Sequence, residues 1–216
     1  MTSSEKSSVG NIEIIVKDLG KRFNREWIFR NLNYKFEPAN VYAITGPNGS
    51  GKSTLLQVLW GQLPQSKGEL KYKNASHEIP VEEIYRHLAI ATPYLDLIEE
   101  FTLLEHLRFH FKMKRSRNNM DEHEILDKMQ LTKARDKHIA NFSSGMKQRV
   151  KLALAFFTQA DLIFLDEPTT NLDSNAASWY HEQLKGLPLQ CTIFIASNQA
   201  SEYPQNAKIL NILDLK

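Results

Sequence analysis

The segment from Val41 to Thr54 restricts the possible folds of this chain more strongly than any other part of its sequence. A short apolar run, Val41–Thr45, is followed by a glycine-rich loop and then by apolar residues on a helical period. The loop matches the pattern G-x-x-x-x-G-K-[ST] and reads Gly46-Pro47-Asn48-Gly49-Ser50-Gly51-Lys52-Ser53-Thr54. A strand, such a loop and a helix in this order predict a phosphate-binding loop in an α/β fold.

Each residue type in this loop has a physical reason. Glycines let the backbone curl so that its N–H groups point at phosphate oxygens, and the positive end of the following helix adds to the attraction. In such a loop Lys52 reaches the β- and γ-phosphates and the Ser53 hydroxyl binds Mg²⁺. The alternative is a glycine-rich turn before a capped helix, which would match by chance in roughly one chain in several hundred. We therefore predict nucleotide binding.

A second motif combines an apolar strand with two carboxylates. The run Leu162–Leu165 is followed directly by Asp166 and Glu167. Buried parallel strands have this composition, and their carboxyl ends carry the ligand sites of α/β sheets. Asp166 is suited to hold Mg²⁺ through water, and Glu167 to polarise an attacking water as a general base. A strand before an acidic turn is more often structural, but the phosphate loop in the same chain favours the catalytic interpretation.

A third segment, Asn141–Arg149, resembles the signature of the ABC ATPases, usually written LSGGQ and here varied to FSSGM. The pattern alone predicts that Ser143 caps a helix. The resemblance implies that Ser143, Ser144 and Gly145 at this helix N-terminus contact the γ-phosphate of ATP bound to an opposite subunit. The segment Thr170-Asn171-Leu172-Asp173 resembles the D-loop of the family, which implies that Asp173 helps to organise the dimer interface; the local alternative is an Asn/Asp turn.

The resemblance covers about Ile12 to Leu213 and is to the ATP-binding subunit of an ABC transporter. It implies an α/β fold: a P-loop NTPase core (RecA-like mixed sheet) with an N-terminal antiparallel β subdomain and an inserted α-helical subdomain at about 95–158. Residues 11–216 would form a single domain. It also implies ATP and Mg²⁺ as ligands, a homodimer or heterodimer with a second ATP-binding subunit, and a separate transmembrane subunit. The expected location is cytoplasmic, on the inner face of the cell membrane.

The resemblance also suggests site roles for three further residues, but the sequence around each of them matches the family less well. Phe23 fits the aromatic residue that stacks on adenine in the family, although Trp27 could substitute and a core role is an alternative for both. Tyr94 follows Thr92-Pro93, where the family has a glutamine that senses Mg²⁺ and water. Asn198 follows Ser197, where the family has a switch histidine. An asparagine can hydrogen-bond to a γ-phosphate but cannot become cationic or carry a proton.

The overall composition leaves few other classes open. The chain has 216 residues, a formal net charge of +2 and one cysteine, Cys191, so an internal disulfide is excluded and a nucleic-acid partner is not expected. No run approaches the roughly 20 apolar residues of a membrane span, and the polar stretch Met1–Gly10 is expected to be a disordered tail. The alternatives are a soluble ABC ATPase acting on DNA or ribosomes, and a nucleotide-gated scaffold with little turnover.

Periodicity predicts strands in both halves of the chain and helices in the middle. The expected strands are Ile12–Asp18, Ile28–Phe36, Val41–Thr45, Glu69–Lys73, Leu88–Thr92, Leu162–Leu165, Thr192–Ala196 and Ile209–Leu213. The expected helices are Ser53–Leu63, Leu103–Lys114, His123–Gln130 and Ser144–Thr158. No linker rich in glycine or serine separates these parts, which favours one α/β core with a helical insertion.

Overall fold

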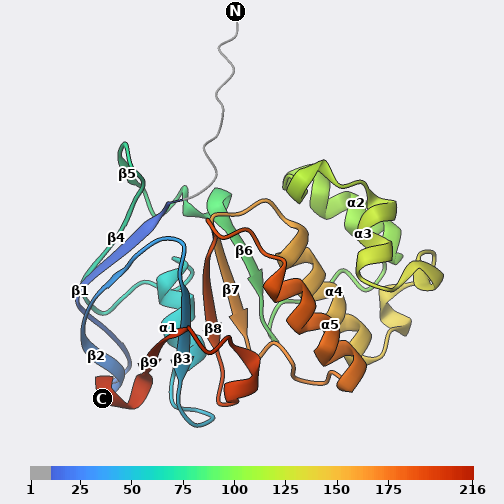
Figure 1. Cartoon of the computed structure of the whole chain (residues 1–216). Helices are drawn as coiled ribbons and strands as arrows, with labels where there is room; N and C mark the ends of the chain where they lie inside the picture. The colour runs from blue at the N-terminus through green and yellow to red at the C-terminus, as the bar shows by residue number, and fades with distance from the viewer. Residues whose placement is uncertain (1–10) are drawn as a thin grey trace, which may run out of the picture.

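The structure is a computed structural model that describes residues 11–216, so the tail predicted at Met1–Gly10 lies outside the described residues. Two β-sheets lie on either side of helix α1 (Lys52–Leu59), as Figure 1 shows. The first sheet is antiparallel and has the strand order β2-β1-β4-β5. Its strands are β1 (Glu13–Phe23), β2 (Glu26–Phe36), β4 (Lys67–Lys73) and β5 (Glu78–Ile79).

The second sheet forms the centre of the molecule. Its strand order is β6-β7-β8-β3-β9, and every pair in it is parallel. The strands are β3 (Val41–Thr45), β6 (Leu88–Ala91), β7 (Leu162–Asp166), β8 (Thr192–Ala196) and β9 (Lys208–Asn211). The expected α/β architecture is therefore confirmed, with one difference in detail: the antiparallel strands form a separate sheet, so the central sheet is parallel rather than mixed.

The other helices lie beyond the opposite face of the central sheet (Figure 1). They are α2 (Leu103–Met113), α3 (Glu122–Lys128), α4 (Ser144–Phe157) and α5 (Ser174–Lys185). Alternation along the strands explains this layering, because successive side chains of a strand point to opposite faces. In β7, Phe164 packs in the cluster that contains α1, whereas Ile163 and Leu165 pack in the cluster that contains α4 and α5.

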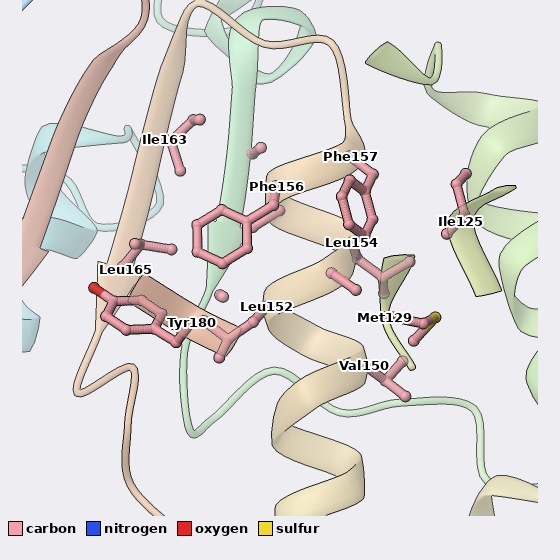
Figure 2. Close-up of a cluster of buried hydrophobic side chains, with 14 of the residues drawn as sticks. Ile125, Met129, Val150, Leu152, Leu154, Phe156, Phe157, Ile163, Leu165 and Tyr180 are labelled. Carbon is pink, nitrogen blue, oxygen red and sulfur yellow. The ribbon is translucent and has the colours of Figure 1, made fainter. Parts of the chain in front are cut away.

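Helix α4 joins the central sheet to the smaller helical part of the molecule. Figure 2 shows Leu152 and Phe156 on the side of α4 that faces β7. Val150, Leu154 and Phe157 point the other way, towards α3. Burying an aliphatic or aromatic side chain of this size contributes roughly 1.5–3 kcal/mol. A helix buried on two sides therefore holds α2 and α3 firmly against the core.

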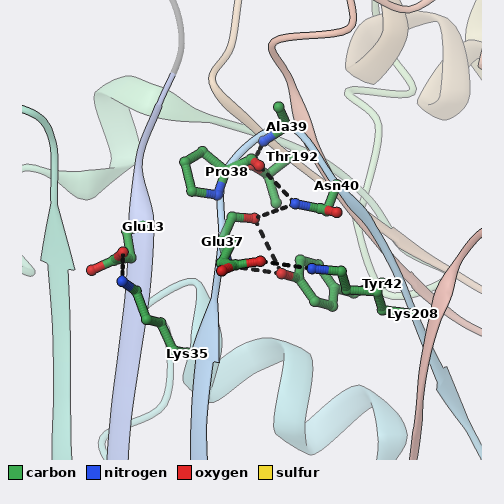
Figure 3. Close-up of polar contacts among 9 residues, drawn as sticks. All are labelled: Glu13, Lys35, Glu37, Pro38, Ala39, Asn40, Tyr42, Thr192 and Lys208. Atoms are coloured by element: carbon green, nitrogen blue, oxygen red, sulfur yellow. Dashed lines mark hydrogen bonds and ion pairs between the residues drawn. The ribbon is translucent and has the colours of Figure 1, made fainter.

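The connection between β2 and β3 is bonded to the first residues of β8 and β9 (Figure 3). The Glu37 carboxylate lies 2.8 Å from Lys208 Nζ of β9, and the Tyr42 hydroxyl bonds to the backbone of Glu37. The backbone N–H of Ala39 donates to Thr192 Oγ1 of β8 at 3.0 Å. These contacts fix where β3 begins, and therefore where the loop after it emerges.

The differences from the predicted elements lie at their ends and in two missed segments. Helix α1 ends at Leu59 instead of Leu63, because the chain turns at Gly61, which has a φ of +82°. Strand β5 and helix α5 were not predicted, and β9 ends at Asn211, after which Ile212–Leu215 form a 3-10 turn. Across residues 11–216, none of the helices has the length and apolar character needed to span a bilayer.

Two histidines one turn apart on α2, His106 and His110, are turned into the protein. His110 Nε2 lies 2.8 Å from Thr158 Oγ1, whose hydroxyl donates to the Leu154 carbonyl at 2.6 Å. Because that hydroxyl proton is already used, His110 Nε2 is the donor in the first bond. Burial lowers the pKa of His110 to about 4, and the neighbouring His106 and Lys114 act in the same direction.

We expect the free energy of unfolding to fall as the pH is lowered from 7 to 5. The depressed pKa of His110 means that the unfolded chain binds more protons below about pH 6.5, so this contribution is present above that pH and is lost towards pH 4. The expected loss by pH 5 is on the order of 1–2 kcal/mol. Urea unfolding at several pH values measures it.

The comparison variant is His110→Gln, which keeps an N–H donor for Thr158 but does not titrate. Its stability should depend less on pH than that of the wild type. His123→Gln, at an exposed position on α3, is the matched control. Equal pH slopes for the wild type and His110→Gln would contradict the assignment.

Candidate nucleotide site

The ends of three neighbouring strands are in register at one edge of the central sheet. Ala196 of β8 pairs with Asp166 of β7 on one side and with Ile44 of β3 on the other. The phosphate loop begins at Gly46, Glu167 directly follows β7, and Asn198 follows β8 by two residues. The sheet therefore brings the three sequence motifs to one place, at the carboxyl edge where α/β sheets bind ligands.

The phosphate loop has a backbone that only small residues adopt readily. Gly46, Gly49 and Gly51 have φ values of +145°, +75° and +106°. A Cβ atom at Gly51 would also lie 2.3 Å from Ile28 Cγ2 of β2. The loop is thus curled as its sequence pattern requires, with the first turn of α1 directly after Gly51.

The side chains of the loop are arranged around its own backbone. Lys52 is buried, and its Nζ donates to the carbonyls of Gly46 and Pro47 at 3.0 and 3.1 Å. The Ser50 hydroxyl is buried without a hydrogen-bond partner among the described residues. Ser53 and Thr54 are half-buried at the start of α1. A positive helix end, a buried ammonium group and an unused hydroxyl form a suitable environment for an anion.

Asp166 lies at the bottom of the site and is only 1% exposed. Burial raises the pKa of its carboxyl to about 6, with Glu167 and Glu202 acting in the same direction and Ser53 and Lys52 opposing them. Its Oδ1 atom is buried without a hydrogen-bond partner in the described part of the chain. A carboxylate oxygen left unpaired next to a serine hydroxyl fits a divalent cation, because Mg²⁺ is bound by such oxygen ligands.

Glu167 is half-buried and has an unusual backbone conformation. Its φ is +45°, in the left-handed region that non-glycine residues rarely adopt. Its N–H donates to the Ala196 carbonyl at 2.9 Å, which ties it to the end of β8. Such local strain is typical of functional positions and persists only where neighbouring contacts hold it.

Asn198 contacts the phosphate loop directly. Its Nδ2 atom donates to Asn48 Oδ1 at 3.0 Å. Ser197, just before it, is buried, and its N–H donates to the Ile44 carbonyl of β3 at 3.0 Å. The exposed amide of Asn198 is therefore held over the loop from a fixed strand end.

The segment that resembles the signature begins α4. Ser143 is the N-cap as predicted, since its Oγ accepts from the N–H of Met146 at 3.2 Å. Ser143 and Ser144 are exposed, and a Cβ atom at Gly145 would lie 2.8 Å from the Asn171 carbonyl. Asp173 caps α5 through a bond from Ala176 N–H at 2.8 Å. The N-terminus of α4 therefore contacts the loop that follows Glu167 in the same chain.

Two predicted site residues, Phe23 and Tyr94, have exposed side chains. Phe23 ends β1, is 47% exposed and has Lys21 Nζ 5.1 Å from the centre of its ring. Trp27 is half-buried beside Arg22. The Tyr94 side chain is 73% exposed, and its hydroxyl makes no hydrogen bond to the described residues.

Three residues near Glu167 were missed in the sequence. The buried Gln148 side chain of α4 donates to the Pro168 carbonyl at 2.9 Å. The Thr169 N–H donates to Glu202 Oε1 at 3.0 Å, and the Thr169 hydroxyl donates to the same oxygen. Glu202 is 1% exposed. The only hint in the sequence is an acidic residue shortly after a buried strand, which by itself predicts nothing.

The parallel sheet, the curled loop and the acidic strand end define a P-loop nucleotide-binding protein. Residues 29–170 match the family model described as "ABC transporter", and the chain belongs to this family. It is therefore an ATP-binding protein of the ABC class, whose members in general hydrolyse ATP and serve as subunits of transporters.

Curated relatives carry the same kind of name. The chain is 27% identical over 171 residues to the uncharacterized ABC transporter ATP-binding protein YybJ of Bacillus subtilis, which covers 79% of this chain and 78% of the relative. It is 27% identical to the lantibiotic transport ATP-binding protein SrtF of Streptococcus pyogenes, covering 92% and 85%. For YcbN of Bacillus subtilis, another uncharacterized relative, the match covers 90% of this chain but only 64% of the relative.

A solved structure shows the same fold. The putative ABC transporter ATP-binding protein from Pyrococcus furiosus superimposes with a TM-score of 0.78 at 20% identity, covering 94% of this chain and 98% of the other. The expected fold class is therefore confirmed over nearly the whole chain.

Proposed function

We propose that this chain hydrolyses ATP to ADP and phosphate as the ATP-binding subunit of an ABC transporter. The observation that supports this most directly is the register of the strand ends. It gathers Lys52 and Ser53, Asp166 and Glu167, and Asn198 around one site. The buried Oδ1 atom of Asp166, which has no hydrogen-bond partner among residues 11–216, supports a role for Mg²⁺.

Each group then has a separate task. The Gly46–Thr54 loop and Lys52 bind the phosphates, for which the Lys52 ammonium leaves the loop carbonyls that it now contacts. Ser53 and Asp166 would hold Mg²⁺, which neutralises charge on the phosphates when bound. Glu167 accepts a proton from the attacking water as general base. Asn198 donates an amide hydrogen bond to the γ-phosphate and holds it in position.

The second half of the site comes from another subunit in this proposal. Ser143, Ser144 and Gly145 present an exposed, capped helix N-terminus that suits a phosphate, and the loop ending at Asp173 lies against it. ATP would therefore join two such subunits, in a homodimer or a heterodimer. Phe23 would stack on the adenine, since Ile28 of the same hairpin lies against Gly51 of the loop.

The transmembrane subunit would bind at a cavity of about 310 Å³ between β6 and α2. Its lining is mainly apolar and includes Leu88, Leu95, Leu97, His106, His110 and Lys114. A partner helix with an apolar face fits such a lining. This proposal places the chain in the cytoplasm, on the inner face of the membrane. Co-purification with a multi-spanning membrane protein tests it.

The experiment that tests the catalytic part is a phosphate-release assay on the purified chain with Mg-ATP, alone and with its membrane partner. Hydrolysis that requires Mg²⁺ and rises more steeply than the first power of protein concentration supports a dimeric ATPase. A preparation that binds Mg-ATP and never releases phosphate under either condition would overturn the proposal. That result would support the second candidate, a nucleotide-gated scaffold, which the replacement of the family's histidine by Asn198 favours.

Asn198→His is expected to raise the turnover number. A histidine would keep a hydrogen-bond donor over the phosphate loop and add the capacity to become cationic. Because the general base is left unchanged, the rise should be about threefold to tenfold, well below the 10²–10⁴-fold of acid–base catalysis. Steady-state phosphate release at saturating ATP measures it.

Asn206→His, at an exposed position before β9, is the matched control and should leave turnover unchanged. A fall in turnover for Asn198→His would show instead that the amide is adapted to its contact with Asn48 and is not a weakened switch residue.

A further inference from the structure

Glu202 is a buried carboxylate to which none of the three sequence motifs gives a role. It ends the 3-10 turn Ala200–Glu202 that follows Asn198. Its Oε1 atom accepts two hydrogen bonds from Thr169, one from the backbone N–H at 3.0 Å and one from the hydroxyl. Burying a carboxylate is costly unless it is paired and hydrogen-bonded, so this contact must be maintained once the chain folds.

The turn that carries Glu202 is itself fixed. The backbone carbonyl of Glu202 accepts a hydrogen bond from the buried Tyr180 hydroxyl of α5 at 2.7 Å. The Glu202 N–H donates to the Gln199 carbonyl at 3.1 Å, and the Gln199 N–H donates to Ser197 Oγ at 2.8 Å. Glu202 is thus a rigid extension of β8, the strand that also delivers Asn198.

The segment that Glu202 holds is the one that contains Glu167. The Glu167 N–H donates to the Ala196 carbonyl at the end of β8, and two residues later the Thr169 N–H donates to Glu202, which lies six residues beyond Ala196. Glu167, the first of these two anchored residues, has the strained φ of +45°. The Thr169 carbonyl in turn accepts from the Leu172 N–H at 3.0 Å, so the loop towards Asp173 starts from the same anchor.

We propose that Glu202 is a positioning residue for ATP hydrolysis, which holds Thr169 so that Glu167 and the 169–173 loop keep their place relative to Asn198. This rests on the proposed function. Glu202 lies behind the site, through Thr169, and does not touch the reacting atoms. It affects the rate through the orientation of Glu167, and ATP binding at the phosphate loop does not depend on it.

The test compares kcat, KM for ATP, and backbone hydrogen exchange of the 167–173 segment in the wild type, Glu202→Ala and Glu202→Gln. In Glu202→Ala, we expect kcat to fall about tenfold or more, KM to change by less than about threefold, and exchange to rise in 167–173. Glu202→Gln keeps an oxygen that can accept both bonds from Thr169, so it should retain kcat within about threefold.

Glu105→Ala is the matched control. Glu105 Oε2 likewise accepts from both the N–H and the hydroxyl of one threonine, Thr102, at 2.8 Å each, but on the exposed surface of α2. This variant should leave kcat and the exchange of 167–173 unchanged. An unchanged kcat in folded Glu202→Ala would overturn the proposal, as would equal losses in the Ala and Gln variants.

The exchange measurement separates failure of this proposal from failure of the proposed function. If the wild type releases no phosphate, the ATPase assignment fails. In that case the role of Glu202 is tested by the backbone hydrogen exchange of residues 167–173 alone. Faster exchange there in Glu202→Ala than in Glu105→Ala supports the proposal that Glu202 holds this segment, and equal exchange overturns it. Exchange that rises across the whole chain would mean general destabilisation and would also overturn it.

Discussion

Replacement of Glu167 by glutamine is expected to reduce steady-state ATP hydrolysis by about 10²–10⁴-fold, the usual contribution of general acid–base catalysis. Glutamine has the shape of glutamate and keeps the N–H that binds the Ala196 carbonyl, but its amide cannot accept a proton from water. The phosphate loop is untouched, so ATP should still bind and still drive dimer formation. Phosphate release and sedimentation with and without Mg-ATP measure the two effects separately.

Glu182→Gln, on the exposed side of α5, is the matched control for this substitution and should behave as the wild type in both measurements. Unchanged phosphate release by Glu167→Gln would remove Glu167 from the mechanism. Loss of ATP-driven dimers together with activity would instead indicate that the strained turn had changed its shape, and the base assignment would have no support.

Lys52→Ala is expected to weaken ATP binding by about 100-fold, because hydrogen bonds to charged groups contribute roughly 1.5–3 kcal/mol and this ammonium reaches two phosphates. Hydrolysis should become undetectable. In the free protein, the hydrogen bonds of Lys52 Nζ within residues 11–216 go to two loop carbonyls, at 3.0 and 3.1 Å. The substitution therefore removes little that holds the fold together. Calorimetric titration with ATP gives the affinity, and thermal unfolding checks the fold.

Lys208→Ala is the control for the loss of a lysine. It removes the 2.8 Å ion pair with Glu37 between β9 and the β2–β3 connection, away from the loop. Its ATP affinity should match that of the wild type. If Lys52→Ala binds ATP within about threefold of the wild type, Gly46–Thr54 is not a phosphate-binding loop, whatever its shape.

The central part of the fold could be predicted from the sequence because its signals are local and strong. Strands β3, β7 and β8 are short, apolar and almost fully buried, and the phosphate loop needs its glycines at fixed spacing. The cap Ser143 could likewise be recognised as a polar residue before a helix, whereas Asp173 was not predicted as the cap of α5. In these cases the physical cause lies within a few residues of its effect.

Helix α5 was missed because it is mostly polar. Only Ala176, Trp179 and Tyr180 are buried, so its apolar pattern is too sparse to predict a helix. The Asn198–Asn48 contact and the bond between Glu202 and Thr169 could not be predicted for a different reason. Each joins residues far apart in the sequence, and their partners are defined only when the sheet has formed.

The pairing of Ala196 with Asp166 and Ile44 limits how this protein can change during evolution. Adjacent strands are about 4.8 Å apart, so the sheet fixes the distance between the ends of β7 and β8, which carry Asp166, Glu167 and Asn198. A one-residue deletion within β8 would turn every later side chain to the other face, moving Asn198 off the phosphate loop. Insertions should therefore be tolerated in surface connections, whereas insertions or deletions within β3, β7 and β8 should not be tolerated.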